Sequence, residues 1–240
     1  MSRKVFVAGA SGVIGRALLK LLAADYTVYG ATRRAEKVKD IEATGAKAVV
    51  VDVYDAERLN EELVRIQPWA VIHQLTDLPR GLSPELMAKA VENNARIRTE
   101  GTRNLVAAAR AAGAARLIAQ SIAWAYRPGD TPYLETCPLD VEAQGSRGIS
   151  VGGVAALEQQ VLSEPALNGT VLRYGQLYGP DTGTDEPTGT SPVHVQAAAR
   201  AVLLALQKEQ SGIFNITQDS PTVSNEKAKR ILGWSPTVEA

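Results

Sequence analysis

The stretch that decides the fold is Val5-Phe6-Val7-Ala8-Gly9-Ala10-Ser11-Gly12-Val13-Ile14-Gly15-Arg16. It opens on a short apolar run that predicts a buried strand, and three glycines follow at a spacing of three. From Ile14 onward, apolar residues recur at helical spacing, so a helix is expected to begin inside the glycine stretch. A strand, a tight glycine turn and a helix form the context in which a glycine motif becomes informative.

Each glycine of this turn has a physical reason to be there. Gly9 lets the backbone turn where a Cβ would clash, Gly12 lets the main chain approach a pyrophosphate, and Gly15 lets the helix pack closely on the strand. The free N–H groups and positive dipole end of the helix would then face phosphates. The alternative is a glycine-rich turn without a ligand. The turn therefore predicts a dinucleotide site made by Gly9, Ser11, Gly12, Val13, Ile14 and Gly15.

Composition limits the class of protein. The chain has 240 residues, 45% of them apolar, and 26 basic residues balance 26 acidic ones. This is enough for one buried core, and scattered, balanced charge predicts neither a nucleic-acid nor a membrane partner. No leader precedes the first strand and no apolar run reaches the ~18 residues of a membrane helix, so we expect a cytoplasmic protein. One cysteine, Cys137, and two histidines predict no disulfide framework and no metal site.

Strand-like and helix-like segments alternate along the first half of the chain. Short apolar runs predict further strands at 27–31, 47–52, 68–73 and 116–121. Helical patterns lie between them, at 35–44, 55–66 and 83–112. Near-continuously apolar strands that alternate with helices predict a parallel sheet covered on both faces. Right-handed crossovers then give an α/β, Rossmann-type, doubly wound sheet with strand order 3-2-1-4-5.

The second half of the chain is less regular. We expect loops at 126–150 and 178–192, helices at 151–162, 195–207 and 224–232, and strands at 170–173 and 212–216. The whole chain, 1–240, is predicted to be one domain, in which 174–240 contributes a small C-terminal substrate part. Ligands bind at the carboxyl ends of parallel strands. The substrate mouth is therefore expected from the loops at 74–82, 122–150 and 174–194.

Together these landmarks resemble the short-chain dehydrogenase/reductase superfamily, and most of all its extended and atypical branch, the NAD-dependent epimerase/dehydratase family. The glycine spacing matches that branch rather than the G-x-G-x-x-G of other Rossmann enzymes. Four later segments are also similar to the family in sequence and order: Val71–Leu75, Leu172–Pro180, Val193–Ala201 and Leu232–Pro236. The resemblance implies a dinucleotide cofactor, a small-molecule substrate and a homodimer through the helices at 83–112 and 150–162.

The resemblance also assigns positions around the cofactor. Asp52 and Val53 would flank the adenine, although Asp52 has the alternative of a plain turn residue at a strand end. The ribose and pyrophosphate side would be lined by Gln74, Leu75 and Thr76.

The end of the second strand predicts which cofactor binds. An NAD site usually places Asp or Glu there for the ribose hydroxyls, whereas this strand ends Gly30-Ala31-Thr32-Arg33-Arg34. Guanidinium groups suit a phosphate through paired charge-assisted hydrogen bonds. We therefore predict NADP(H) over NAD(H), held by Arg33 and Arg34. The alternative is that one or both arginines are solvated residues that open a helix.

The catalytic positions depart from the family pattern. Relatives use Ser or Thr after the fifth strand and Tyr-x-x-x-Lys on the next helix, where the tyrosine exchanges a proton with the substrate oxygen. With Glu158 as the anchor, Ser150 falls at the tyrosine and Val154 at the lysine. Ile122 falls at the usual hydroxyl, and Arg98 stands where relatives often carry asparagine. The standard tyrosine–lysine mechanism is therefore unavailable on this alignment.

Four hydroxyls are candidate substitute proton donors: Ser121, Tyr126, Ser150 and Tyr178. Structural alternatives exist, namely a strand-end hydrogen bond for Ser121, packing for Tyr126 and a helix N-cap for Ser150. His73 is expected to be a satisfied buried histidine. Arg173 is expected to pair with a carboxylate, with anion binding as its alternative.

The leading hypothesis is an NADP(H)-dependent oxidoreductase of the atypical short-chain type, acting on a small carbonyl, hydroxyl or activated alkene. Hydride transfer does not strictly need the tyrosine–lysine pair, because the cofactor carries the hard chemistry. The loop at 181–191 is short for the family, which argues against a large nucleotide-sugar substrate. Two alternatives stay open. One is a sugar epimerase or dehydratase, which the missing pair disfavours, and the other is a non-catalytic NADP(H)-binding sensor or regulatory protein.

Overall fold

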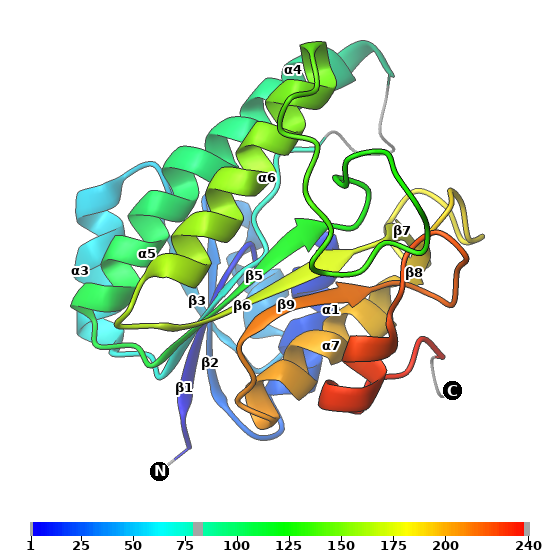
Figure 1. Ribbon diagram of the computed structural model, residues 1–240. Coiled ribbons are helices and arrows are strands. Elements are labelled where there is room, and N and C mark those ends of the chain that lie inside the picture. The colour runs from blue at the N-terminus through cyan, green and yellow to red at the C-terminus, as the bar shows by residue number, and fades with distance from the viewer. Residues whose placement is uncertain (1, 79–83, 238–240) are drawn as a thin grey trace.

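A computed structural model describes residues 2–78 and 84–237, and it shows a seven-stranded parallel sheet between two helical layers (Figure 1). The strand order is β3-β2-β1-β4-β5-β6-β9, so the predicted order 3-2-1-4-5 is confirmed. The strands are β1 (Lys4–Ala8), β2 (Thr27–Thr32), β3 (Lys47–Val50), β4 (Ala70–His73), β5 (Arg116–Ile122), β6 (Asn168–Tyr174) and β9 (Gly212–Ile216). Every neighbouring pair in this sheet is parallel, as the near-continuously apolar strands require.

Two hydrophobic cores lie on the two faces of the sheet. Val5 and Val7 of β1 belong to one core, and Phe6 and Ala8 belong to the other, because successive side chains of a strand point to opposite faces. The first core is covered by α1 (Val13–Leu22), α2 (Val38–Glu42) and α7 (Val195–Gln207). The second is covered by α3 (Ala56–Ile66), α5 (Thr102–Ala111) and α6 (Gly145–Ser163).

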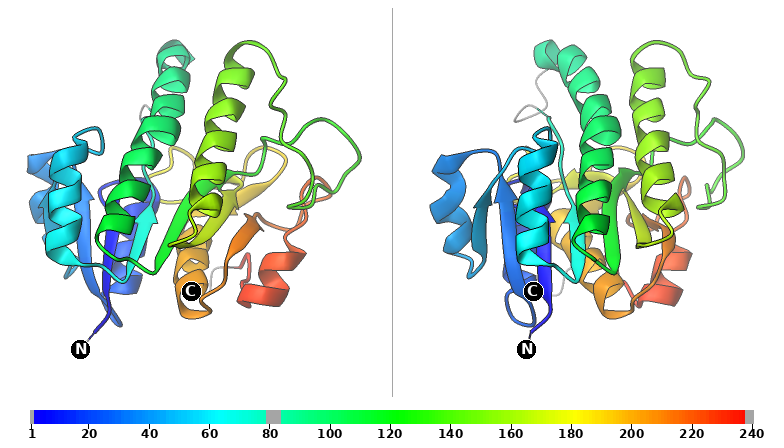
Figure 2. Two further views of the ribbon diagram at one scale, coloured as in Figure 1. Left: turned by 60° about the vertical axis from the view of Figure 1, so that its left-hand side comes forward. Right: turned by 90° about the vertical axis from the view of Figure 1, so that its left-hand side faces the viewer.

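The helices α3, α5 and α6 stand side by side along one face of the sheet (Figure 2). In the described part of the predicted 83–112 helix, α4 (Pro84–Arg96) continues through a π-helical turn, Ile97–Gly101, into α5. None of the described helices combines the length and apolarity needed to cross a membrane.

Helix α6 begins earlier than its sequence indicates. The predicted loop at 126–150 ends at Gln144, which is the N-cap, so the first residues of the helix were wrongly assigned to the loop. Glycines at 148, 152 and 153 lower the helix propensity of this segment. Packing overrides the propensity, because a Cβ at Gly153 would lie 2.9 Å from the Cα of Ala95, which places α4 almost in backbone contact with α6.

Three other predicted segments differ in detail. The predicted helix at 35–44 is a 3-10 turn, η1 (Ala35–Lys37), followed by the short α2. The predicted loop at 178–192 contains the end of β7 (Gln176–Tyr178) and the start of β8 (Pro192–His194), which form a separate two-stranded sheet. The last predicted helix is short and ends in a π-helical turn, η4 (Ala228–Leu232).

Candidate cofactor and catalytic site

The glycine turn joins the end of β1 to the start of α1 at the carboxyl edge of the sheet. Gly9 has a φ of +87°, and a Cβ there would lie 2.6 Å from the carbonyl oxygen of Gln74. A Cβ at Gly15 would lie 2.2 Å from the carbonyl oxygen of Gly9. Gly12 is the N-cap of α1 and offers no side chain to the first turn, so the helix N–H groups stay available to a ligand.

Polar side chains connect this turn with the end of β2, the neighbouring strand. The guanidinium of Arg34 donates to the Oγ of Ser11 at 3.3 Å, and the Ser11 and Thr32 hydroxyls lie 3.2 Å apart. Arg33 extends toward the loop after β4, where it pairs with Asp77 at 3.0 Å. A guanidinium and two hydroxyls therefore converge beside the glycine turn, and groups of this kind can donate hydrogen bonds to a phosphate.

The predicted residues at the ends of β3 and β4 differ in their surroundings. The Asp52 carboxylate accepts from the backbone N–H of Tyr54 at 3.0 Å, as a turn residue does. Val53 is buried, whereas Thr76 is exposed. Gln74 is buried, and its Oε1 has no hydrogen-bond partner within the described residues. A buried acceptor without a donor is costly, which fits a position that meets a ligand.

Two of the candidate hydroxyls belong to a buried network. Ser121 donates to Glu158 Oε1 at 2.7 Å, and Arg173 holds both oxygens of the same carboxylate at 2.8 and 2.6 Å. Tyr126 donates to Asn215 Oδ1 at 2.6 Å and accepts from Arg173 at 2.9 Å. The prediction that Arg173 pairs with a carboxylate is confirmed. Both hydroxyls already donate hydrogen bonds to buried side chains, so each has a structural role.

Burial and the neighbouring charges shift the pKa values of Arg173 and Tyr126. Burial disfavours the charge on Arg173, but the hydrogen bonds and negative charge of Glu158 outweigh it and raise the Arg173 pKa. Burial raises the pKa of Tyr126, and the Arg173 charge offsets part of that rise. A phenol that is buried and raised in pKa is a poor acid at neutral pH.

Ser150 and Val154, which the sequence analysis aligns with the family tyrosine and lysine, lie on α6. Val154 is fully buried and packs with Ala125 and Val151 in an apolar cluster, so no charge stands at the lysine position. Ser150 lies inside the helix rather than at its start, and its predicted N-cap role is therefore wrong. A pocket of about 240 Å³ is lined by Ile122, Trp124, Ser146, Arg147, Ser150 and Val151. This pocket contains both Ile122 and Ser150, the positions aligned with the family hydroxyl and tyrosine.

Arg98 enters this region from the π-helical turn between α4 and α5. One of its nitrogens donates to the Oγ of Ser150 at 3.3 Å and to the carbonyl oxygen of the same residue at 3.4 Å. Burial lowers its pKa to about 10, against the opposing charge of Glu158, so it stays charged at neutral pH. The sequence marked Arg98 as a departure from the family but gave it no role.

His73 is fully buried at the end of β4, close to Arg98. Its Nδ1 accepts from the backbone N–H of Leu75 at 3.2 Å, so Nε2 carries the proton and donates to the Thr102 hydroxyl at 2.9 Å. Burial and the positive charge of Arg98 lower its pKa to about 4. His73 is therefore a satisfied, neutral histidine, as predicted.

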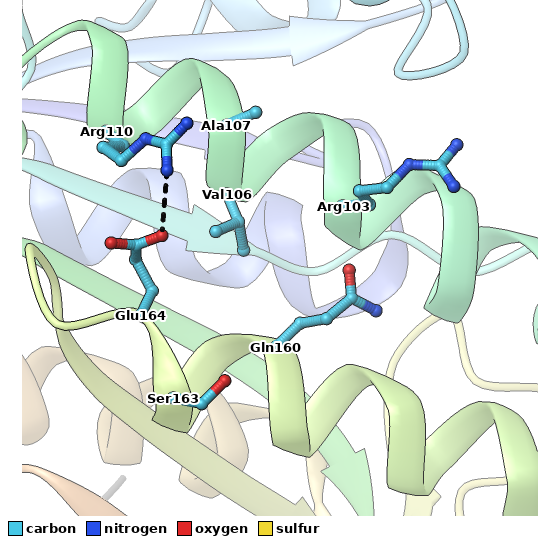
Figure 3. A pocket seen from close by; sticks show the side chains of 7 residues that line it. All are labelled: Arg103, Val106, Ala107, Arg110, Gln160, Ser163 and Glu164. Carbon is cyan, nitrogen blue, oxygen red and sulfur yellow. Dashed lines mark ion pairs between the residues drawn. The ribbon is translucent and has the colours of Figure 1, made fainter.

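Tyr178 of β7 accepts a hydrogen bond from the Gln218 side chain at 2.5 Å and packs edge-on against His194. A second pocket, of about 300 Å³, lies on the outer side of α5 and the C-terminal half of α6 (Figure 3). The ion pair between Arg110 and Glu164, 3.6 Å long, joins its two walls. Its lining includes no residue of the glycine turn or of a strand end, so it is not part of the candidate site.

The doubly wound parallel sheet and the glycine turn define a Rossmann-type α/β protein. Residues 5–193 match the NAD dependent epimerase/dehydratase family. The chain belongs to this family, and the resemblance to the extended short-chain dehydrogenases/reductases is confirmed.

One curated relative and two solved structures place the chain further. A 3-diazoavenalumate denitrifying reductase from Streptomyces sp is 37% identical over 278 residues, with 98% of this chain and 88% of the relative covered. UDP-glucose 4-epimerase from Thermus thermophilus, in complex with NAD, is 20% identical with a TM-score of 0.78, covering 99% of this chain and 95% of that one. UDP-glucose-4-epimerase from Stenotrophomonas maltophila, with bound NAD and formylated UDP-arabinopyranose, is 20% identical with a TM-score of 0.76. The match covers 99% of this chain and 94% of that one. The two structures share the fold, and the relative is a reductase.

Proposed function

We propose that this protein is an NADPH-dependent reductase that delivers hydride to a small electrophile without the tyrosine–lysine pair. The observation that carries the proposal is the coexistence of two features at one sheet edge. The glycine turn and Arg34 are suited to a phosphorylated dinucleotide, whereas Val154 stands where the lysine would be. The relationship to a reductase, which extends over 98% of this chain, supports reduction as the type of chemistry.

The preference for NADPH rests on the end of β2. Thr32, Arg33 and Arg34 offer a hydroxyl and two guanidinium groups, and the segment Gly30–Arg34 contains no carboxylate. A carboxylate there would accept from ribose hydroxyls and would repel a phosphate, whereas Arg34 beside Ser11 attracts one. The structural neighbours carry NAD, so the phosphate is the specific point to test.

NADPH, when bound, supplies the hydride. The chain's own part is to hold both reactants, exclude water and stabilise charge, because no side chain at the positions of Ile122 and Val154 can donate a proton. Electrophiles that need no proton from the protein suit such a site. Replacement of a diazonium group by hydride is one example, since a C–H bond forms as the C–N bond breaks and N2 leaves with the C–N electron pair.

The relative named for a diazo acid makes this class the first to test. Small carbonyls and activated alkenes belong to the same proposal, with water as the source of the proton. A sugar epimerase or dehydratase is the weaker proposal, because exchange of a proton with a sugar hydroxyl needs the missing acid–base pair.

The experiment has two stages. Calorimetric titration with NADPH and with NADH comes first, and we expect tight binding of NADPH and weak binding of NADH. NADPH oxidation is then followed with diazo arene acids, carbonyls and activated alkenes. Turnover of any one class supports the reductase. Tight binding without turnover favours the non-catalytic sensor, and binding of neither dinucleotide overturns the proposal.

Two further expectations stay predictions. We propose one domain over residues 1–240, which a single unfolding transition supports. We also propose a homodimer through the helices at 83–112 and 150–162, which light scattering checks.

A further inference from the structure

Arg98 forms no ion pair with a carboxylate of the described residues. Within residues 2–78 and 84–237 its hydrogen bonds go to Ser150 alone. The carboxylate that acts on it is that of Glu158, which already binds Arg173 through both oxygens and accepts from Ser121. Two guanidinium groups therefore share one carboxylate, and the neutral His73 adds no compensating charge. Arg98 therefore depends on a carboxylate that Arg173 already engages.

The hydrogen bonds of Arg98 use only one of its nitrogens within the described residues. Both start from one nitrogen and both are long, at 3.3 and 3.4 Å. The other N–H groups of a guanidinium form a planar fork that matches a carboxylate in a bidentate arrangement. A partly buried charge without such a partner is unfavourable, so an incoming anion would gain from binding there.

The backbone holds Arg98 in this place. It lies in the π-helical turn Ile97–Gly101, and single π turns inside helices occur frequently at functional sites. The close approach of α4 to α6 at Gly153 and Ala95 fixes the facing helix, which carries Ser150. The arginine therefore meets α6 at the level of the missing tyrosine.

The pocket beside Ser150 indicates what kind of anion would fit. Its walls include the apolar side chains of Ile122, Val151 and the partly exposed Trp124. Its own arginine, Arg147, is engaged with Asp140 at 2.6 Å and with two backbone carbonyls. A largely apolar molecule with one acidic group matches a pocket of about 240 Å³ that has three apolar side chains in its lining and a cation behind Ser150.

We propose that Arg98, together with the Ser150 hydroxyl, is the receptor for the carboxylate of an aromatic or conjugated acid, which is the substrate class of this protein. The proposal rests on the proposed function, because it takes the pocket at Ile122 and Ser150 as the substrate site. Arg98 is then a binding residue that fixes the orientation of the substrate. Arg98 lies across from Ser150, the residue aligned with the family tyrosine.

Calorimetric binding of 4-hydroxycinnamate and its uncharged amide, 4-hydroxycinnamide, tests the proposal. Both probes are titrated into the wild type and Arg98→Gln, with saturating NADP+ and without it. Arg103→Gln is the matched control, since it removes the same charge from an exposed site on α5. We expect Arg98→Gln to lose about 10- to 100-fold in affinity for the acid and to keep its affinity for the amide. Arg103→Gln should change neither.

Any other outcome overturns the proposal that Arg98 binds the carboxylate. The proposal is wrong if the wild type binds the acid no more tightly than the amide. It is also wrong if Arg98→Gln still binds the acid more tightly. Equal losses for acid and amide show that Arg98 only packs α4 against α6. If Arg98→Gln does not fold, Arg98→Lys and Ser150→Ala are measured in its place. Arg98→Lys keeps a positive charge, so it should still bind the acid more tightly than the amide. NADPH titration of the same samples separates the two proposals, because failure to bind NADPH overturns the proposed function while the acid preference still tests Arg98.

Discussion

Two regions at the carboxyl edge of one sheet differ in how far they follow the family. The glycine turn after β1 keeps the family spacing, and its backbone contacts explain why. On the proposed alignment, α6 carries Ser150 and Val154 in place of the family tyrosine and lysine, yet α6 still packs on the same core. Under the proposed function, dinucleotide binding and proton transfer depend on different physical features of the chain.

The difference lies in what each region is made of. The turn consists of main chain that passes within van der Waals contact of itself, so a side chain at Gly15 would displace the backbone. The catalytic pair consists of side chains on the surface of a helix. Val154 belongs to the apolar cluster of Ala125 and Val151, so an apolar side chain fits this position of the helix.

The largest predicted effect concerns Glu158, the acidic anchor that the altered region has kept. Glu158→Ala would leave the Arg173 guanidinium buried and unpaired, so we expect a loss of about 3–5 kcal/mol in unfolding free energy. Urea denaturation measures it. Glu61→Ala, which breaks an exposed pair with Arg58, is the control and should cost at most about 0.5 kcal/mol. A small effect at Glu158 would mean that the carboxylate is free to serve the chemistry.

The next effect concerns His73, which lies between the two regions. Its folded pKa is about 4 against 6.5 in the unfolded chain, so the unfolded state binds the extra proton. The unfolding free energy should therefore fall as pH drops from about 6.5 to about 4, by up to about 3 kcal/mol from this residue. Comparison of wild type with His73→Asn across that range isolates the contribution. NMR titration of Arg98→Gln should show the His73 pKa moving upward, and an unmoved pKa would contradict the proximity of the two charges.

A smaller effect tests the glycine-turn region. Arg34→Ala should weaken NADPH binding by about 10- to 100-fold, because it removes a charge-assisted pair with the phosphate, and should leave NADH binding unchanged. Lys37→Ala, a nearby change on η1 that disrupts only the pair with Asp40, is the control. Equal weakening of both dinucleotides would show that Arg34 supports the turn rather than reads the phosphate.

The smallest effect comes from two neighbouring glycines of α6. Gly152→Ala should raise the unfolding free energy by about 0.5–1 kcal/mol, since a Cβ there meets no atom of the described residues within 4 Å and alanine favours the helix. Gly153→Ala should lower it, because the new Cβ would lie 2.9 Å from the Cα of Ala95. Thermal denaturation resolves the difference in sign. The same sign for both would mean that α4 and α6 are not closely packed at this level.

Much of the framework was predictable from local patterns. The strand order, the glycine turn and the pairing of Arg173 with a carboxylate follow from apolar periodicity, backbone requirements and the cost of an unpaired charge at a strand end. The start of α6 was not predictable, because its glycines disfavour a helix in isolation and are required only by the contact with Ala95. The small β7–β8 sheet was missed for a similar reason, since its pairing joins segments on either side of a loop.

The sequence by itself determined the fold class, because apolar periodicity and the glycine spacing are properties of residue type along the chain. It also predicts the place of a dinucleotide and the absence of the usual acid–base pair. Only the tertiary structure decided that Ser121 and Tyr126 donate their protons inside a buried network. It also decided that Arg98 faces Ser150 across two helices. These pairings depend on which side chains the packed helices bring into one volume. No pattern along the chain carries that information, because residues 98 and 150 are 52 positions apart and meet only where two packed helices bring them together.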